Sequence, residues 1–89
     1  MRIYEKTHIA TATSTLVYSG QCVLRYITVN TTAAGAVTIA DAITDTTPVI
    51  GILKASTVEG TYRYDCIMAT GIHVKTAAAS DLTVVYEKL

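Results

Sequence analysis

Apolar and polar side chains alternate along the stretch from Gly60 to Met68. Four large apolar side chains share one face of such a strand, namely Tyr62, Tyr64, Cys66 and Met68. The other face carries Thr61, Arg63 and Asp65. A period of two with large residues on one side is typical of a half-buried β-strand. Gly60 and Gly71 are turn formers that bound the element, so we predict a strand between them.

The same criteria predict further strands along the chain. The stretch from Cys22 to Val29 is rich in β-branched and aromatic residues, which pack well on a pleated surface. The stretch from Val49 to Lys54 is apolar on both faces, which predicts a central strand, and Pro48 stands at its start, where a strand tolerates proline. The other expected core strands are residues 36–41, 72–76 and 82–89.

Short strands recur at spacings of about ten residues, and no helical period interrupts them. About seven or eight such strands predict an all-β fold, and we expect a small antiparallel β-sandwich or jelly-roll-like domain. Strands joined by short turns should pair with each other in this fold. An immunoglobulin domain is disfavoured because the chain contains no tryptophan.

The N-terminal segment differs from the rest of the chain. Residues 1–9 alternate only weakly, and residues 10–15 are small side chains with little to bury. We therefore expect residues 1–19 to form an extended N-terminal arm or an edge strand, and residues 20–89 to form the β-sandwich. An arm of this kind gains order on another subunit, which gives five candidate partner-binding residues: Ile3, Tyr4, His8, Ile9 and Tyr18.

The composition is unusual for a small domain. Of the 89 residues, 51% are hydrophobic and only 16% are charged, with a formal net charge of zero. An average globular domain is about 25% charged. Two explanations remain open. Threonine, the commonest residue, keeps the surface polar without charge, or part of an apolar surface is covered by copies of the chain or by a partner.

The distribution of charge argues against several classes of partner. The seven lysines and arginines are scattered among seven acidic residues, so the clustered cations that nucleic-acid binding requires are missing. No apolar run approaches the roughly 20 residues of a membrane-spanning helix. The first residues lack the apolar core of a signal peptide, so we expect synthesis and retention in the cytoplasm until assembly.

Cysteine and metal chemistry add little. Cys22 and Cys66 lie in expected strands and could face each other across the core. A reducing cytoplasm favours two buried thiols, and a disulfide is the alternative. His8 and His73 have no ligand spacing around them. Asp41 and Asp45 are near in sequence, but calcium needs six or more oxygens, so we expect no metal and no cofactor.

No catalytic constellation is visible in the sequence. The serines have no neighbouring histidine and aspartate, and the acidic residues form no close pair along the chain. The alternative that stays open is a pair of catalytic residues that are distant in the sequence and close together in the folded chain. We therefore predict no catalytic residues and a protein that is not an enzyme.

Several short motifs occur in a distinctive order. They are Ile27-Thr28-Val29-Asn30-Thr31, a turn containing Gly35, Val37-Thr38-Ile39-Ala40-Asp41, Gly60-Thr61-Tyr62-Arg63-Tyr64, Thr70-Gly71-Ile72-His73-Val74 and Asp81-Leu82-Thr83-Val84-Val85-Tyr86. Over residues 22–88 this order resembles small β-rich virion proteins of tailed bacteriophages, of the head decoration or cement class. The resemblance implies a homo-oligomeric subunit in the virion that binds the major capsid protein and neighbouring copies and stabilises the shell.

A second hypothesis belongs to another class. Exposed tyrosine rings can stack on sugars. The sequence does not decide whether the side chains of Tyr4, Tyr18 and Tyr26 face the core or the solvent. The chain is then a glycan- or receptor-binding β-sandwich module of a phage fibre or an adhesin. The commoner role of tyrosine is a body in the core with its hydroxyl at the rim, which favours the first hypothesis.

Overall fold

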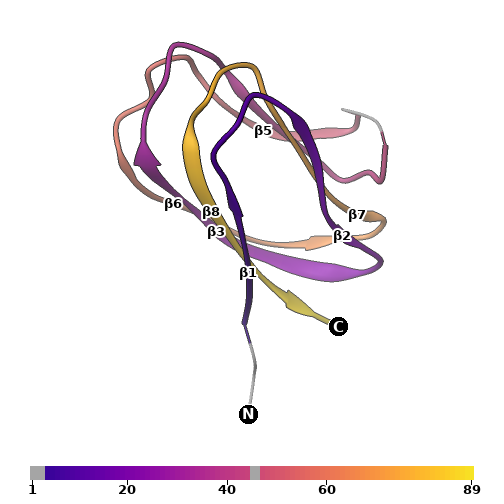
Figure 1. Cartoon of the computed structure of the whole chain (residues 1–89). Helices are drawn as coiled ribbons and strands as arrows, with labels where there is room; N and C mark the ends of the chain where they lie inside the picture. The colour runs from indigo at the N-terminus through magenta and orange to yellow at the C-terminus, as the bar shows by residue number, and fades with distance from the viewer. Residues whose placement is uncertain (1–3, 45–46) are drawn as a thin grey trace.

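Eight β-strands form two four-stranded sheets in the computed structural model of the chain, which describes residues 4–44 and 47–89 (Figure 1). The strands are β1 (Glu5–Ile9), β2 (Ser14–Ser19), β3 (Cys22–Thr31), β4 (Val37–Ala40), β5 (Val49–Leu53), β6 (Gly60–Met68), β7 (Gly71–Thr76) and β8 (Asp81–Lys88). The described residues form no helix. The expected all-β class is confirmed.

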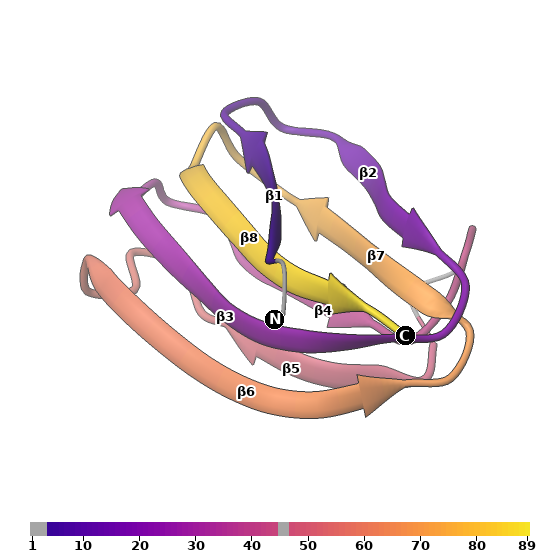
Figure 2. The same cartoon turned by 90° about the horizontal axis from the view of Figure 1, so that it is seen from below.

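The strand order defines a jelly roll. Sheet A has the order β1-β8-β3-β6, sheet B has the order β2-β7-β4-β5, and every pairing is antiparallel. The pairs are nested: β1 with β8, β2 with β7, β3 with β6 and β4 with β5. Figure 2 shows β8, β3 and β6 running side by side in one layer. A double sheet of eight strands with this nesting is the jelly-roll form of the β-sandwich.

One expectation about pairing is wrong. Among the described strands that follow one another in sequence, only β4 and β5 are hydrogen-bonded neighbours. At the other connections the chain crosses to the opposite sheet. Short connections therefore link the two layers here, because a nested chain places each strand's partner far away in sequence.

One core lies between the sheets. Its fully buried members are Leu24, Ile27, Ile39, Met68, Ile72, Leu82, Val74, Val84 and Cys22. The alternation predicted for β6 is confirmed, because its even positions pack against this core and Met68 is completely buried. Full burial of such side chains contributes about 1.5–3 kcal/mol each, which makes this layer the main source of stability.

The central strand β3 carries an irregularity that shapes the outer face of sheet A. Cys22 and Leu24 are buried before it and Ile27 and Val29 after it, a change of phase within one strand. The register shifts between Leu24 and Tyr26 against both neighbouring strands. A bulge inserts an extra residue and re-aims side chains. The extra residue leaves Arg25 and Tyr26, two consecutive positions, only partly buried, and it returns Ile27 and Val29 to the core.

The expectation of a central strand at Val49–Lys54 is wrong. β5 is the last strand of sheet B and leaves Val49, Ile50 and Ile52 46%, 38% and 56% exposed. β7, in contrast, lies between β2 and β4 and is buried at five of its six positions. Apolarity on both faces reports burial only if strands flank the segment on both sides, and β5 has one neighbour.

The N-terminal segment contributes to both sheets. β1 is the edge strand of sheet A beside β8, and β2 is the edge strand of sheet B beside β7. Residues 1–19 are expected to form either an extended arm or an edge strand. The structure describes residues 4–19 of this segment, and they contain two edge strands joined by a short connection. Each of these strands makes main-chain hydrogen bonds within the sandwich itself.

Candidate partner-binding surface

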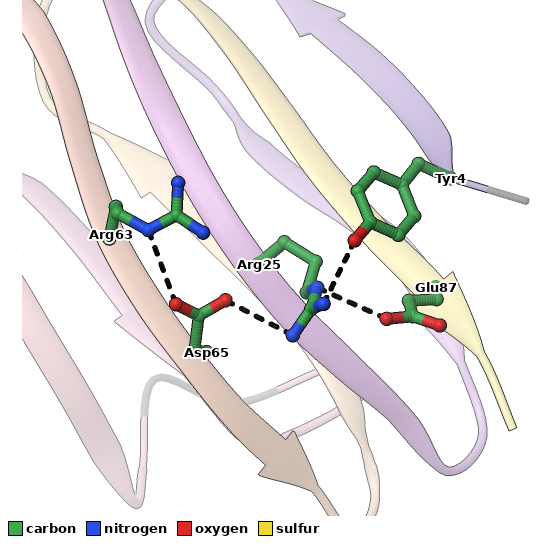
Figure 3. A network of polar contacts seen from close by, with 5 residues as sticks. All are labelled: Tyr4, Arg25, Arg63, Asp65 and Glu87. Atoms are coloured by element: carbon green, nitrogen blue, oxygen red, sulfur yellow. Dashed lines mark hydrogen bonds and ion pairs between the residues drawn. The ribbon is translucent and has the colours of Figure 1, made fainter. Parts of the chain in front are cut away.

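A network of polar side chains covers the outer face of sheet A (Figure 3). Arg25 lies at its centre, with Nε 3.0 Å from Glu87 Oε1 and Nη1 3.2 Å from Asp65 Oδ1. Its Nη2 donates a 2.8 Å hydrogen bond to the Tyr4 hydroxyl. Arg63 Nε lies 3.3 Å from the other oxygen of Asp65. The side chains of this network project from the three strands β3, β6 and β8 and from Tyr4, the residue before β1.

This network is internally neutralised. Two guanidinium groups face two carboxylates, and the hydrogen bond to Tyr4 raises the pKa of Arg25 further above its usual range. The Arg25 guanidinium also lies 5.2 Å from the centre of the Tyr4 ring, in cation–π geometry. A ligand would have to displace these contacts before it could bind. We therefore interpret the network as a contact that holds the segment at β1 against sheet A.

A second polar cluster ties β1 to the start of β8. His8 Nε2 lies 2.6 Å from Asp81 Oδ1, and Asn30 donates to the same oxygen at 3.1 Å. These two hydrogen bonds lower the pKa of Asp81. The side chain of His8 is 60% exposed, so this cluster sits at the surface. Its hydrogen bonds link β1 to β8 and to the end of β3.

The four candidate partner-binding residues that the structure describes do not form one surface. Tyr4 is 47% exposed but lies against Arg25, and His8 is exposed but paired with Asp81. Ile9 is only 4% exposed and belongs to the core, so its side chain is not available to a partner. Tyr18 packs against the core. Ile3 lies outside the described residues.

Asp41 is a structural residue that the sequence indicated only as a turn former. Its carboxylate accepts three backbone N–H groups from the β6–β7 turn: Ala69 at 2.9 Å, Thr70 at 2.7 Å and Gly71 at 3.2 Å. Burial would raise the pKa of Asp41, but the three donors outweigh it and the pKa is lowered. The ionised carboxylate therefore fixes the turn that leads from sheet A to sheet B. Asp45, the other aspartate of the candidate pair, lies outside the described residues.

Both cysteines are free thiols. Cys22 lies on β3 and Cys66 on the neighbouring β6, and both side chains face the interior. Burial raises the pKa of Cys22 to about 11, helped by the nearby charge of Asp41, and burial likewise raises the pKa of Cys66. A thiol with a raised pKa is a poor nucleophile, so these residues act as small apolar side chains.

The most unusual surface is at the opposite edge of the molecule, on β5. Val49 and Ile52 line a shallow cavity of about 400 Å³ on the outer face of sheet B, together with Thr38 and Lys75. With Ile50, three of the five β5 residues have large, apolar and exposed side chains. The lack of charged residues in β5 is visible in the sequence, but the same feature is typical of a buried strand. We call this strand with its exposed side chains the β5 edge.

Neither a metal-binding cluster nor a membrane-spanning helix occurs in the described part of the chain. Within residues 4–44 and 47–89, no three histidine, cysteine, aspartate or glutamate side chains gather where they could hold a metal ion. The same part of the chain contains no helix that is long and apolar enough to cross a membrane.

Comparison with known proteins supports the fold. No protein-family model matches the chain, and no curated protein matches it. Among solved structures, the chain is similar to the core of Drosophila NLP with a TM-score of 0.58 and 17% sequence identity, over 94% of this chain and 95% of that one. The report of that crystal structure concerns pentamer formation and histone binding by NLP. At this identity the likeness shows that both chains share a β-sandwich fold.

Proposed function

We propose that this protein is a non-enzymatic structural subunit that acts by self-association, and specifically a decoration or cement subunit of a tailed-phage capsid. In this role it binds neighbouring copies and the major capsid protein in the virion. The observation that carries the self-association is the β5 edge, where Val49, Ile50 and Ile52 expose apolar surface beside unpaired backbone. Such surface on a small domain marks a site of protein contact.

The fold is compatible with this role. Jelly rolls are recurrent in viral capsid proteins, although fold alone does not define function. The described surface offers a stable outer face on sheet A, where charges are neutralised internally, and an apolar edge on sheet B. The NLP core forms pentamers, so a sandwich of this type tolerates self-association. The capsid assignment itself rests on the order of the sequence motifs.

Histone binding does not extend to this chain. A partner rich in lysine and arginine requires an acidic surface, since complementary potentials steer and hold charged partners. Here seven acidic residues are balanced by seven basic ones. In addition, Asp65 and Glu87 on sheet A are already paired with arginine.

The glycan-binding alternative receives less support. A sugar platform needs an aromatic face open to solvent. The ring of Tyr4 lies under Arg25, the ring of Tyr26 lies 5.8 Å from the Arg63 guanidinium, and Tyr18 packs on the core 5.5 Å from Tyr86. A glycan array probed with the purified protein distinguishes the two hypotheses, because an assembly subunit gives no specific hits.

Two measurements test the proposal. Analytical ultracentrifugation over a concentration series should show a mass above the 9.5 kDa of one chain. The protein should also co-sediment with phage particles that lack it. A chain that remains monomeric up to about 1 mM, where even weak contacts form, would overturn the self-association. A protein that self-associates but does not co-sediment with such particles would overturn the capsid role alone.

A further inference from the structure

The backbone of β5 has an unused hydrogen-bonding edge. β5 is the terminal strand of sheet B, bonded only to β4 among the described strands. In an antiparallel edge strand, alternate residues direct their N–H and C=O groups away from the sheet. Extended backbone from another chain satisfies such groups directly, which makes the edge a template for strand addition.

The other three edges are protected from this kind of pairing. β1 carries Glu5, Lys6 and His8, and β6 carries Arg63 and Asp65. Charged side chains and bulges are the usual devices that keep sheet edges from pairing. β2 is uncharged but is interrupted by a bulge between Leu16 and Tyr18.

β5 lacks most of that protection. Its sequence, Val49–Leu53, contains no charged residue. One irregularity occurs opposite Ile39 and Ala40, at the start of the strand. The part from Gly51 to Leu53 keeps a regular register with β4. A regular, apolar and uncharged edge is the kind that associates.

The exposed apolar surface follows the strand edge and does not spread over the sheet face. Ile52 is opposite Thr38, and Thr38 is opposite Lys75, so the row leading inward from Ile52 becomes polar at once. A partner that packed on the outer face of sheet B would bury this lysine. A partner that added a strand beside β5 would cover Ile52 and its neighbours while leaving Lys75 in solvent.

We infer that β5 pairs antiparallel with β5 of a second copy about a twofold axis, joining the two sheets B into one continuous sheet. The inference deepens the proposed function and rests on its self-association. Two copies supply strands of equal length with apolar residues opposite apolar residues. Antiparallel pairing also keeps the two Lys54 side chains at opposite ends, whereas parallel pairing would place these like charges side by side.

β5 is held in place for this contact before a partner arrives. Tyr64, from β6 of the other sheet, packs directly over Gly51, where an added Cβ would come within 2.6 Å of its hydroxyl oxygen. Tyr64 thus contacts β5 from the core side, while the outer edge of β5 has no neighbouring strand among the described residues. Pre-organisation lowers the conformational entropy lost on association.

The test compares the native mass of three proteins: the wild type, Ile52→Lys and Ile67→Lys. Ile67 is 66% exposed on β6 and serves as the matched control. We expect the wild-type mass to be an even multiple of 9.5 kDa, Ile52→Lys to lower it at least twofold, and Ile67→Lys to leave it unchanged. Melting temperatures verify that all three fold, since both substituted side chains are exposed.

The outcomes separate this inference from the proposed function. A wild-type oligomer with an odd number of chains, or one whose mass Ile52→Lys leaves intact, would overturn the β5 pairing and leave self-association standing. A monomeric wild type would overturn both. As a second readout, Ile52→Cys should cross-link to itself between copies with a short bis-maleimide, and Ile67→Cys should not. Equal cross-linking of the two variants would contradict the twofold β5 pairing.

Discussion

At the scale of single residues, the polar side chains of this protein mainly hold backbone in place. Asp41 uses both carboxylate oxygens to accept three N–H groups of one turn. Arg25 connects β3 to both flanking strands of sheet A through Asp65 and Glu87. The charged groups of Asp41 and Arg25 are therefore engaged within the fold.

Asp41→Asn should destabilise the protein by about 1–3 kcal/mol at neutral pH, because an amide group replaces one acceptor oxygen with a donor that faces an N–H. The pKa of Asp41 is lowered in the folded state, so its contribution is fully present above the ordinary value near 3.9 and is lost as pH falls through the lowered pKa. Urea unfolding should therefore show a difference from the wild type that shrinks below about pH 4. A difference that is constant across this range would refute the role.

The thiol of Cys22 should not react in the folded protein. It is 0% exposed and its pKa is raised to about 11, so neither access nor ionisation favours attack. In a Cys66→Ser variant, which leaves Cys22 as the single thiol, Ellman's reagent should give no signal at neutral pH and one equivalent in guanidinium. Fast labelling without denaturant would contradict the buried position.

At the scale of elements, β5 lies at the end of sheet B although its sequence is apolar on both faces, whereas β7 lies inside the same sheet. Both are rich in apolar residues, but only β7 has neighbours on two sides. The pinning of β5 by Tyr64 depends on residue 51 having no side chain. This contact crosses between the sheets, so it links the edge of sheet B to the edge of sheet A.

Gly51→Ala should destabilise the fold by about 1–3 kcal/mol, the usual range for overpacking, because the new methyl group would overlap the Tyr64 ring. Tyr64→Phe removes the nearest atom, so Gly51→Ala should cost less in that background. Chemical denaturation of the four proteins of this double-mutant cycle measures the coupling. Additive effects would mean that Tyr64 does not hold β5.

At the scale of the whole molecule, nesting makes the two ends of the chain interdependent. β1 pairs with β8 from Glu5 opposite Tyr86 to Ile9 opposite Leu82. The side chain of Ile9 is part of the core. The first strand is therefore a component of the fold, and the idea that it reaches a separate subunit is replaced by pairing within the chain.

Deleting residues 1–10 should unfold the protein or lower its melting temperature strongly, because β8 loses a hydrogen-bonded neighbour and the core loses Ile9. The milder variant Ile9→Ala should cost about 2–5 kcal/mol, as for other buried aliphatic side chains. Circular dichroism melting curves compare both with the wild type. A truncated chain with wild-type stability would show that β1 is dispensable.

Much of the fold could be predicted from local patterns. The strand from Gly60 to Met68 and its inward face follow from a period of two, which depends only on neighbouring residues. The edge position of β5 and the burial of Ile9 could not be predicted in the same way. They depend on which strands lie beside them, and the sequence carries no local signal for a partner far along the chain.

The candidate partner-binding surface could also be predicted from the sequence only in part. The low charge and apolar composition are compatible with a threonine-rich surface or with a surface covered by other protein molecules, and the weak alternation of residues 1–19 predicts the partner-binding residues there. The structure moves the candidate surface to β5, because β1 and β2 find their partners inside the sandwich. Exposure of Ile52 could not be deduced from a segment that reads as uniformly apolar.

By itself, the sequence determined the strands and the faces of those strands that turn inward, since alternation is a property of adjacent residues. Only the tertiary structure decided which strands lie at an edge, which pair, and which apolar side chains remain in solvent. The reason is distance along the chain. A contact such as His8 with Asp81 joins residues that are 73 positions apart, and no local pattern encodes such a separation.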